Sequence, residues 1–241
     1  MRVVLVTGGA GGIGSAVSRA FAKRGWSVAV HAHESVREAE SLVRELRNAG
    51  ADACAFFADL RTSEGCESLV RETLERFGRI DALVNNAGIS LVKLFSDCSE
   101  EDYDEVMDLN FRAAVRLSRL VLPDMLARGA GRIVNLSSMW GESGASCEAL
   151  YSASKAALIG FTQALGKELA RSGVLVNAVA PGAVDTRMNR ALGKETLDLL
   201  AEETPAGRLA RPEEIAACVL FLAEEDSFLV GQTLSPNGGY L

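Results

Sequence analysis

Apolar runs of strand length alternate with helical patterns of about 12 residues or more along the whole of this 241-residue chain. Runs that are apolar almost throughout, such as Val3–Val6, are typical of a parallel sheet that helices cover on both faces. Such alternation builds right-handed strand–helix–strand units, so the sequence predicts a doubly wound α/β sheet. No linker or repeat divides the chain, and we expect one domain over residues 1–241. The seven predicted strands are Arg2–Thr7, Ser27–Ala32, Ala53–Ala58, Ala82–Asn85, Arg132–Ser137, Leu175–Ala180 and Leu229–Ser235.

The composition excludes several classes of protein. With 48% apolar and 24% charged residues, the chain has the ordinary balance of a globular protein. Its net charge of −7 argues against nucleic acid or an anionic membrane as the main partner. The sequence has neither a signal-peptide layout nor a membrane-spanning run, and its five cysteines are scattered, so we expect a cytoplasmic protein with reduced thiols. Two histidines, His31 and His33, are too few for most metal sites, and we expect none.

A glycine-rich loop joins the first predicted strand to the first helix. It reads Thr7-Gly8-Gly9-Ala10-Gly11-Gly12-Ile13-Gly14. Glycines let the backbone approach a pyrophosphate, and the helix N-terminus adds amides and positive dipole. A tight turn without a ligand would also explain the glycines, but the position after the first strand favours a dinucleotide site. The candidate contacts are Gly8, Gly12, Ile13 and Gly14.

The end of the second predicted strand bears on the choice of cofactor. Enzymes that use NAD usually place an acidic residue here for the ribose 2′-hydroxyl, but this position is Ala32. His33 and Ser35 can donate to a 2′-phosphate, which favours NADP(H) over NAD(H). Glu34 would repel that phosphate, and the glycine loop holds no Arg or Lys, so NAD(H) stays open.

Other cofactor candidates follow later strands, although each would also fit an ordinary turn. After the third strand, a carboxylate can accept a hydrogen bond from the adenine amino group; after the fourth, small residues permit close backbone approach. After the sixth, Pro and Gly force a turn at the carboxyl edge of the sheet, where open α/β folds bind ligands. These candidates are Asp59, Leu60, Asn86, Ala87, Gly88, Pro181, Gly182, Val184 and Thr186.

Four residues are candidates for the chemistry. Ser138 follows the fifth strand, and Tyr151 and Lys155 lie four apart, on one face of a predicted helix over Leu150–Arg171. An ammonium beside a phenol lowers the phenol's pKa, which would make Tyr151 a proton donor or acceptor near neutral pH. A surface lysine beside a core tyrosine is the plainer alternative. Asn110 interrupts a predicted amphipathic helix, and a buried amide there would hold water or backbone in place.

These motifs together resemble the short-chain dehydrogenase/reductase family along nearly the whole chain. The resemblance rests on Thr7–Gly14, Asn85-Asn86-Ala87-Gly88, Pro181-Gly182 and the four candidates above. It implies a Rossmann-type sheet of order 3-2-1-4-5-6-7 and a catalytic tetrad of Asn110, Ser138, Tyr151 and Lys155, with Tyr151 and Lys155 also contacting the cofactor. It further implies a homotetramer packed through the helices predicted at Asp102–Leu126 and Leu150–Arg171. The polar segment 187–207 is expected to be a substrate lid.

Within that family the chain is most similar to 3-oxoacyl-acyl-carrier-protein reductases, which implies NADPH and a fatty-acid biosynthetic substrate. Such enzymes dock an acidic carrier on basic residues near the site entrance, and Arg128 and Arg171 fall close to the corresponding positions. The chain departs from the pattern at Gly11, where these reductases often carry an Arg for the NADP phosphate.

A second departure lies just before Tyr151, where Glu148 and, earlier in the loop, Glu142 bring carboxylates near the expected pocket. They would favour a cationic substrate, and the pattern also resembles the reductases of the 5-aminopentanone modification on elongation factor P. An acidic residue in the first turn of a helix is a sufficient structural explanation for Glu148. The carrier-protein substrate is preferred; another small carbonyl, or a non-catalytic regulator that binds the cofactor, are the remaining alternatives.

Overall fold

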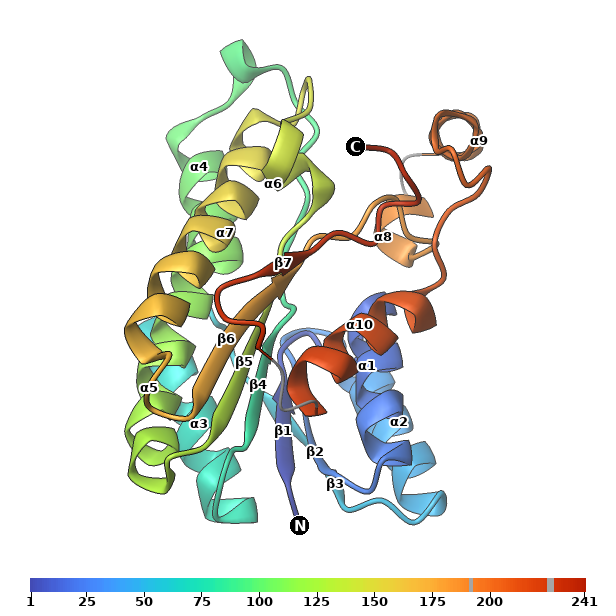
Figure 1. Ribbon diagram of the computed structural model, residues 1–241. Coiled ribbons are helices and arrows are strands. Elements are labelled where there is room, and N and C mark those ends of the chain that lie inside the picture. Colours follow the sequence, from blue (N-terminus) through green and yellow to red (C-terminus); the bar gives the residue numbers. More distant parts are fainter. Residues whose placement is uncertain (191–192, 225–227) are drawn as a thin grey trace.

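The computed structural model describes residues 1–190, 193–224 and 228–241. Its centre is a seven-stranded sheet in the order β3-β2-β1-β4-β5-β6-β7, as predicted (Figure 1). Every neighbouring pair of strands is parallel. The strands are β1 Val3–Val6, β2 Ser27–Ala32, β3 Ala53–Phe57, β4 Ala82–Asn85, β5 Gly131–Leu136, β6 Val174–Val179 and β7 Thr233–Leu234.

Helices cover both faces of the sheet (Figure 1). Successive β1 residues alternate between two apolar clusters: Val4 and Val6 belong to one, and Leu5 to the other. This double burial explains why the strands are apolar almost throughout. On the Val4 face lie α1 Gly12–Lys23, α2 Val36–Asn48 and α10 Pro212–Glu224. On the Leu5 face lie α3 Ser63–Phe77, α5 Ala113–Arg128 and α7 Ala149–Leu169.

The predicted helix over Asp102–Leu126 was wrong as a single α-helix. The chain forms α4 (Glu100–Met107), then a π-helical turn, η2 (Asp108–Arg112), and then α5. A π turn accommodates one residue more than an α turn and so changes the direction of the side chains within it. Asn110 lies in this turn and is buried, with 1% of its surface exposed.

The last predicted strand, Leu229–Ser235, was too long. Only Thr233 and Leu234 form β7, beside Ala178 and Val179. Before them, the side chain of Asn177 takes the place of strand backbone: its Oδ1 accepts from Gln232 N at 2.8 Å, and its Nδ2 donates to Leu229 O at 2.9 Å. A side chain acting as the pairing partner shortens the regular ladder.

The remaining elements lie beyond the carboxyl edge of the sheet. They are η1 Phe95–Asp97, α6 Met139–Ser143, α8 Arg187–Arg190 and α9 Lys194–Glu203. The last two belong to the expected lid, 187–207, of which residues 191–192 lie outside the described part of the chain. None of the described helices is long and apolar enough to cross a membrane.

Candidate active site

The structure brings Asn110, Ser138, Tyr151 and Lys155 together at the carboxyl edge of the sheet. Ser138 follows β5, while Tyr151 and Lys155 lie in the first two turns of α7. Lys155 Nζ lies 5.8 Å from the centre of the Tyr151 ring. A Cβ placed on Gly88 would lie 2.9 Å from Asn110 Oδ1 and 3.3 Å from Lys155 Nζ. Gly88 therefore lies against both side chains, and no larger residue fits there without displacing one of them.

Ser138 is held in place as the N-cap of α6. Its Oγ accepts a hydrogen bond from Trp140 N at 3.2 Å, so the position of Trp140 helps to fix the hydroxyl. The Ser138 side chain also lies close enough to Tyr151 to lower the pKa of the phenol. The serine hydroxyl therefore lies beside Tyr151.

Lys155 is fixed from three sides. Its Nζ donates to Leu136 O at 2.8 Å, and Ser137 Oγ donates to Lys155 O at 2.8 Å. Gly141 packs so closely that an added Cβ would lie 2.8 Å from the Lys155 carbonyl carbon. Because β5 and α6 supply these contacts, the lysine is placed by the same segment that carries Ser138.

Burial dominates the electrostatics of the pair. Desolvation raises the pKa of Tyr151 to about 12, the Glu148 charge adds to the rise, and the Ser138 side chain opposes it. Desolvation lowers the pKa of Lys155 to about 8. The prediction that Lys155 would lower the Tyr151 pKa is wrong for this structure, because burial outweighs any such effect. At neutral pH the phenol holds its proton and the lysine is mostly cationic.

Asn110 joins two segments through its side-chain amide. Oδ1 accepts from Ile89 N at 2.8 Å, and Nδ2 donates to Ile89 O at 2.9 Å and to Ser154 Oγ at 3.0 Å. The sequence analysis expected this amide to hold either water or backbone, and these contacts show that it holds backbone. The chain after β4 is thereby fixed beside Lys155 and α7.

Three glycines of the loop, Gly8, Gly12 and Gly14, cannot be replaced by a larger residue without a shift or strain. Gly8 has a φ of +59°, and a Cβ on Gly14 would lie 2.2 Å from Gly8 O. A Cβ on Gly12 would lie 2.7 Å from Thr186 Cγ2. Helix α1 begins without a side-chain cap and has no acidic residue in its first turn. Its first amides are thus available to an anion, so this cradle fits the pyrophosphate of a dinucleotide.

A buried histidine that the sequence analysis had not assigned supports this loop. His31 in β2 is 2% exposed; its Nδ1 accepts from Gly8 N at 3.1 Å, and its Nε2 lies 3.0 Å from Ala58 O. These partners require the neutral ring with the proton on Nε2. Burial lowers the His31 pKa to about 4. A polar residue inside an otherwise apolar strand was the signal for this role.

Around the expected adenosine end, the candidates differ in accessibility. His33 is exposed and lies 3.9 Å from the Glu34 carboxylate. Asp59 is bound by Arg61, whose Nε and Nη2 donate to it at 2.9 and 2.8 Å. The Leu60 side chain is buried in the core, so only its backbone is free to meet an adenine. The sequence analysis had not assigned Arg61.

The cofactor candidates that follow β4 and β6 are held in place by hydrogen bonds to their backbone. Thr7 Oγ1 accepts from the amides of Asn86 and Ala87 at 2.9 and 3.0 Å, which ties the end of β1 to the end of β4. Met139 N donates to Pro181 O at 2.9 Å, joining the Pro-Gly turn to the Ser138 segment. Two further cofactor candidates, Ile13 and Val184, lie near these hydrogen bonds. Ile13 packs against the core next to the glycine loop, and Val184 is buried and pairs with Ala210.

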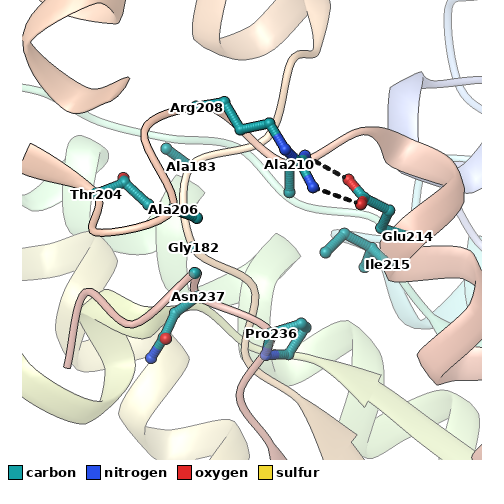
Figure 2. A pocket seen from close by; sticks show the side chains of 11 residues that line it. Gly182, Ala183, Thr204, Ala206, Arg208, Ala210, Glu214, Ile215, Pro236 and Asn237 are labelled. Carbon is teal, nitrogen blue, oxygen red and sulfur yellow. Dashed lines mark hydrogen bonds and ion pairs between the residues drawn. The ribbon is translucent and has the colours of Figure 1, made fainter. Parts of the chain in front are cut away.

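A cavity of about 200 Å³ lies behind the Pro-Gly turn (Figure 2). Gly182 and Ala183 form one wall, Thr204 to Ala210 a second, and Pro236 to Gly238 a third. The Arg208–Glu214 ion pair borders it. Neither Ser138 nor Tyr151 lines this cavity, so it is separate from the four-residue cluster.

The two carboxylates singled out in the sequence have different surroundings. Glu142 Oε1 accepts from Ser235 Oγ at 2.6 Å, so it is directed at the C-terminal segment. Glu148 is half-buried and forms no hydrogen bond or ion pair through its side chain with the residues described here. Burial raises the pKa of Glu148, and its charge acts on Tyr151. Glu148 is therefore the carboxylate that belongs to the cluster.

The structure does not place Arg128 and Arg171 near this site within one chain. Tyr151 lies at the start of α7 and Arg171 just beyond its end, about 30 Å further along the helix. Arg128 donates to Ile80 O at 2.7 Å and pairs with Asp124, at the opposite edge of the sheet. These two residues therefore do not form a basic entrance within one chain, and their role in docking an acidic carrier stays a prediction.

The sequence profile described as short chain dehydrogenase matches residues 2–197. An uncharacterized oxidoreductase, YmfI of Bacillus subtilis, is 41% identical, with 99% of this chain and 98% of the relative covered. An acetoacetyl-CoA reductase of Allochromatium vinosum is 40% identical over 99% of this chain and 98% of that one. The 3-oxoacyl-[acyl-carrier-protein] reductase FabG of Staphylococcus epidermidis is 36% identical, covering 98% and 97% of the two chains.

A solved structure has a similar fold. A variant of the actinorhodin polyketide ketoreductase, described with NADPH, superposes with a TM-score of 0.95 at 37% identity. The match covers 99% of this chain and 97% of the ketoreductase. The similarity therefore extends over the sheet, the site and the C-terminal segment alike.

Proposed function

This chain belongs to the short-chain dehydrogenase family of oxidoreductases, and we propose that it is an NADP-dependent reductase of ketones, with 3-oxoacyl groups on acyl-carrier protein as the preferred substrate. The observation that carries the proposal is the cluster itself. The Ser138 hydroxyl lies close enough to a protonated Tyr151 to lower the pKa of its phenol, and a fixed Lys155 lies beside them. A site that only bound a dinucleotide would have no use for that arrangement.

When bound, the nicotinamide would supply the hydride that reduces the carbonyl carbon. Ser138 donates a hydrogen bond to the carbonyl oxygen and stabilises the negative charge that develops there. Tyr151 gives its proton to that oxygen, so the ketone becomes an alcohol. A pKa of about 12 keeps Tyr151 protonated for this step, and the Lys155 charge stabilises the phenolate that results.

Lys155 and Asn110 support Tyr151 in this proposal. Lys155 would also hold the ribose hydroxyls of the cofactor. Asn110 fixes Ile89 and Ser154 and so keeps Gly88 against the lysine. A water beside Asn110 that returns a proton to Lys155 remains a prediction.

The preference for NADP(H) is supported by the absence of an acidic side chain at Ala32 and by the NADPH of the similar ketoreductase. His33 and Ser35 are the expected donors to the 2′-phosphate, while Glu34 opposes it. Titrating the enzyme with NADPH and NADH, followed by nicotinamide fluorescence, tests the preference. Tighter binding of NADH would overturn it.

The names of two relatives support a 3-oxoacyl thioester, since one is an acetoacetyl-CoA reductase and the other a 3-oxoacyl-[acyl-carrier-protein] reductase. Segment 187–207 is the proposed lid over this substrate. A homotetramer packed through α4, α5 and α7 is part of the same proposal, and analytical ultracentrifugation tests it. A monomer at micromolar concentration would contradict it.

Glu148 supports a second candidate, the reduction of a ketone that bears an ammonium group. Glu148 is a half-buried carboxylate that has no side-chain partner among the described residues, and such burial of a charge is unfavourable. An ammonium group on the substrate would offset this penalty by pairing with the carboxylate. Comparing kcat/KM for an acetoacetyl thioester and for an amine-bearing ketone, in the wild type and in Glu148→Gln, separates the two. Preference for the amine, lost in Glu148→Gln but kept in the control Glu142→Gln, would replace the thioester proposal.

A further inference from the structure

The C-terminal tail, residues 235–241, contacts three segments that the proposed reaction uses. In Figure 1 it leaves β7 and runs between α6 on one side and α8 and α9 on the other. Ser235 binds Glu142 of α6, and Gly182 N donates to Pro236 O at 3.2 Å. Ala206 N, just after α9, donates to Gly238 O at 3.0 Å. The tail therefore joins the Ser138 segment, the Pro-Gly turn and the proposed lid.

Tyr240 makes the two side-chain contacts at the end of this tail. Its hydroxyl donates to the Glu203 carboxylate, at the end of α9, at 2.8 Å. Its ring packs edge-to-face on Trp140, with the ring centres 5.4 Å apart and the planes at 85°. One side chain thus touches the proposed lid with its polar end and α6 with its ring.

Trp140 carries this contact to the catalytic cluster. Its backbone amide donates to Ser138 Oγ, the hydroxyl proposed to bind the carbonyl oxygen. A continuous series of contacts therefore runs from Glu203 through Tyr240 and Trp140 to Ser138. The mechanism above gives Tyr240 no role.

The lid also meets the tail at Gly239, where an added Cβ would lie 3.3 Å from Pro205 Cβ. The cavity behind the Pro-Gly turn lies between Thr204–Ala210 and Pro236–Gly238, and it leaves space where these two segments face each other (Figure 2). Beside that space they meet where Ala206 bonds to Gly238 and where an added Cβ on Gly238 would touch Thr204 at 2.7 Å. The Tyr240–Glu203 hydrogen bond adds a side-chain contact to this junction.

We propose that Tyr240 is a positioning residue for the reduction: its ring sets Trp140 and so the Ser138 hydroxyl, and its hydroxyl holds the end of the lid. The proposal rests on the proposed function, because it assumes that Ser138 binds the carbonyl and that segment 187–207 covers the substrate. The proposal gives the ring and the hydroxyl of Tyr240 different roles. Loss of the hydroxyl should affect substrate binding, and loss of the ring should also affect the chemical step.

Two variants of Tyr240 test this separation with NADPH and an acetoacetyl thioester. Tyr240→Phe keeps the ring, so KM should rise about 3- to 10-fold while kcat stays within about twofold. Glu203→Gln, which replaces the charged acceptor by an amide, should raise KM in the same direction by less. Tyr240→Leu should raise KM and also lower kcat about 10-fold, because Trp140 and Ser138 lose their support. The controls are Glu40→Gln, exposed on α2, and Tyr103→Phe, on α4; both should behave as wild type.

A second readout does not depend on turnover. Trp26 packs on Phe21 in the core and is common to all variants, so the difference in tryptophan emission between wild type and variant reports Trp140. Tyr240→Leu should change that emission, Tyr240→Phe should leave it nearly unchanged, and the dissociation constant for NADPH should stay the same in both. If Tyr240→Leu does not fold, Tyr240→Phe and Glu203→Gln decide the matter through KM alone.

Wild-type values of kcat and KM in Tyr240→Leu would overturn the proposal, as would equal losses of kcat in the Leu and Phe variants. An unchanged KM in Tyr240→Phe would overturn the role of the hydroxyl. These outcomes differ from failure of the proposed function, in which the wild type itself would not oxidise NADPH with any ketone.

Discussion

The region around His31 and the region around Lys155 bury a basic side chain at the same edge of the sheet, yet they give it opposite charge states. His31 is 2% exposed and Lys155 5% exposed. Gly8 N donates to His31 Nδ1, so the ring must accept, whereas Leu136 O accepts from Lys155 Nζ. Burial lowers both pKa values, to about 4 for His31 and about 8 for Lys155, so the histidine is neutral and the lysine mostly cationic near pH 7. The partners of each side chain match these charge states.

The difference follows from what each region is proposed to do. The His31 region shapes backbone: it holds the glycine loop for a cofactor and needs no change of proton. The Lys155 region supports a proton transfer and needs a charge beside Tyr151. Changes near His31 should therefore alter stability and cofactor binding, and changes near Lys155 should alter turnover.

The largest expected effect is in the Lys155 region. Tyr151→Phe removes the proton donor, so kcat for ketone reduction should fall about 1000-fold, since general acid catalysis contributes on the order of 100- to 10,000-fold. Steady-state assay and NADPH titration measure the two quantities, and the dissociation constant should change less than about threefold. A Tyr151→Phe enzyme with the wild-type rate would refute the assignment.

The next effect is a loss of stability at acid pH in the His31 region. The His31 pKa is about 4 in the fold, below its ordinary 6.5, so the unfolded chain takes up the proton first. The stabilisation is complete above about pH 6.5 and is lost as the pH falls to about 4, an amount of about 3 kcal/mol. Urea denaturation across this range should show a smaller loss in His31→Gln than in wild type. If the free energy of unfolding falls equally with pH in the two proteins, protonation of His31 is not the cause of the loss.

A third effect is the pH dependence of turnover in the Lys155 region. The Lys155 pKa of about 8 means that its charge is present below that pH and lost above it, while Tyr151, with a pKa of about 12, keeps its proton. We expect kcat/KM for reduction to fall about tenfold per pH unit above about pH 8. A profile that stays flat to about pH 10 would show that the lysine charge is not needed.

The smallest effect sharpens the comparison within the His31 region. His31→Leu leaves Gly8 N and Ala58 O without their partner and should lower the free energy of unfolding at pH 7 by about 2 kcal/mol. NADPH binding should weaken while kcat at saturating cofactor changes little. His33→Leu, at an exposed position, should leave the free energy of unfolding within about 0.5 kcal/mol of wild type. Equal losses in the two variants would show that burial of His31 contributes nothing specific.

Local patterns were enough to predict much of the fold. Apolar periodicity predicted the alternation of strands and helices, and the glycine motif predicted the turn between the first strand and the first helix. The sheet order was implied by the family resemblance and is confirmed. The π turn could not be predicted in this way, because Asn110 is directed by Ile89 and Ser154, which are 21 and 44 residues away. The start of β7 was misjudged for the same reason, since Asn177 binds Gln232 from 55 residues away.

The candidate site shows the same division. Tyr151 and Lys155 share a helix face, so helical spacing predicted that they would lie together. Their pKa values depend on how deeply the finished fold buries them, and reasoning from the pair alone gave the wrong direction for Tyr151. The support from His31 and Tyr240 involves residues that are distant in sequence and carry no motif.

The most direct test of the proposed function is an activity matrix of the wild-type enzyme: NADPH and NADH, each with an acetoacetyl thioester and with an amine-bearing ketone, followed by nicotinamide absorbance. The account predicts that NADPH is oxidised with a ketone and that the combination of NADPH with the thioester has the highest kcat/KM. If NADPH binds but is not oxidised with any ketone, the chain is a cofactor-binding protein and the central claim is wrong.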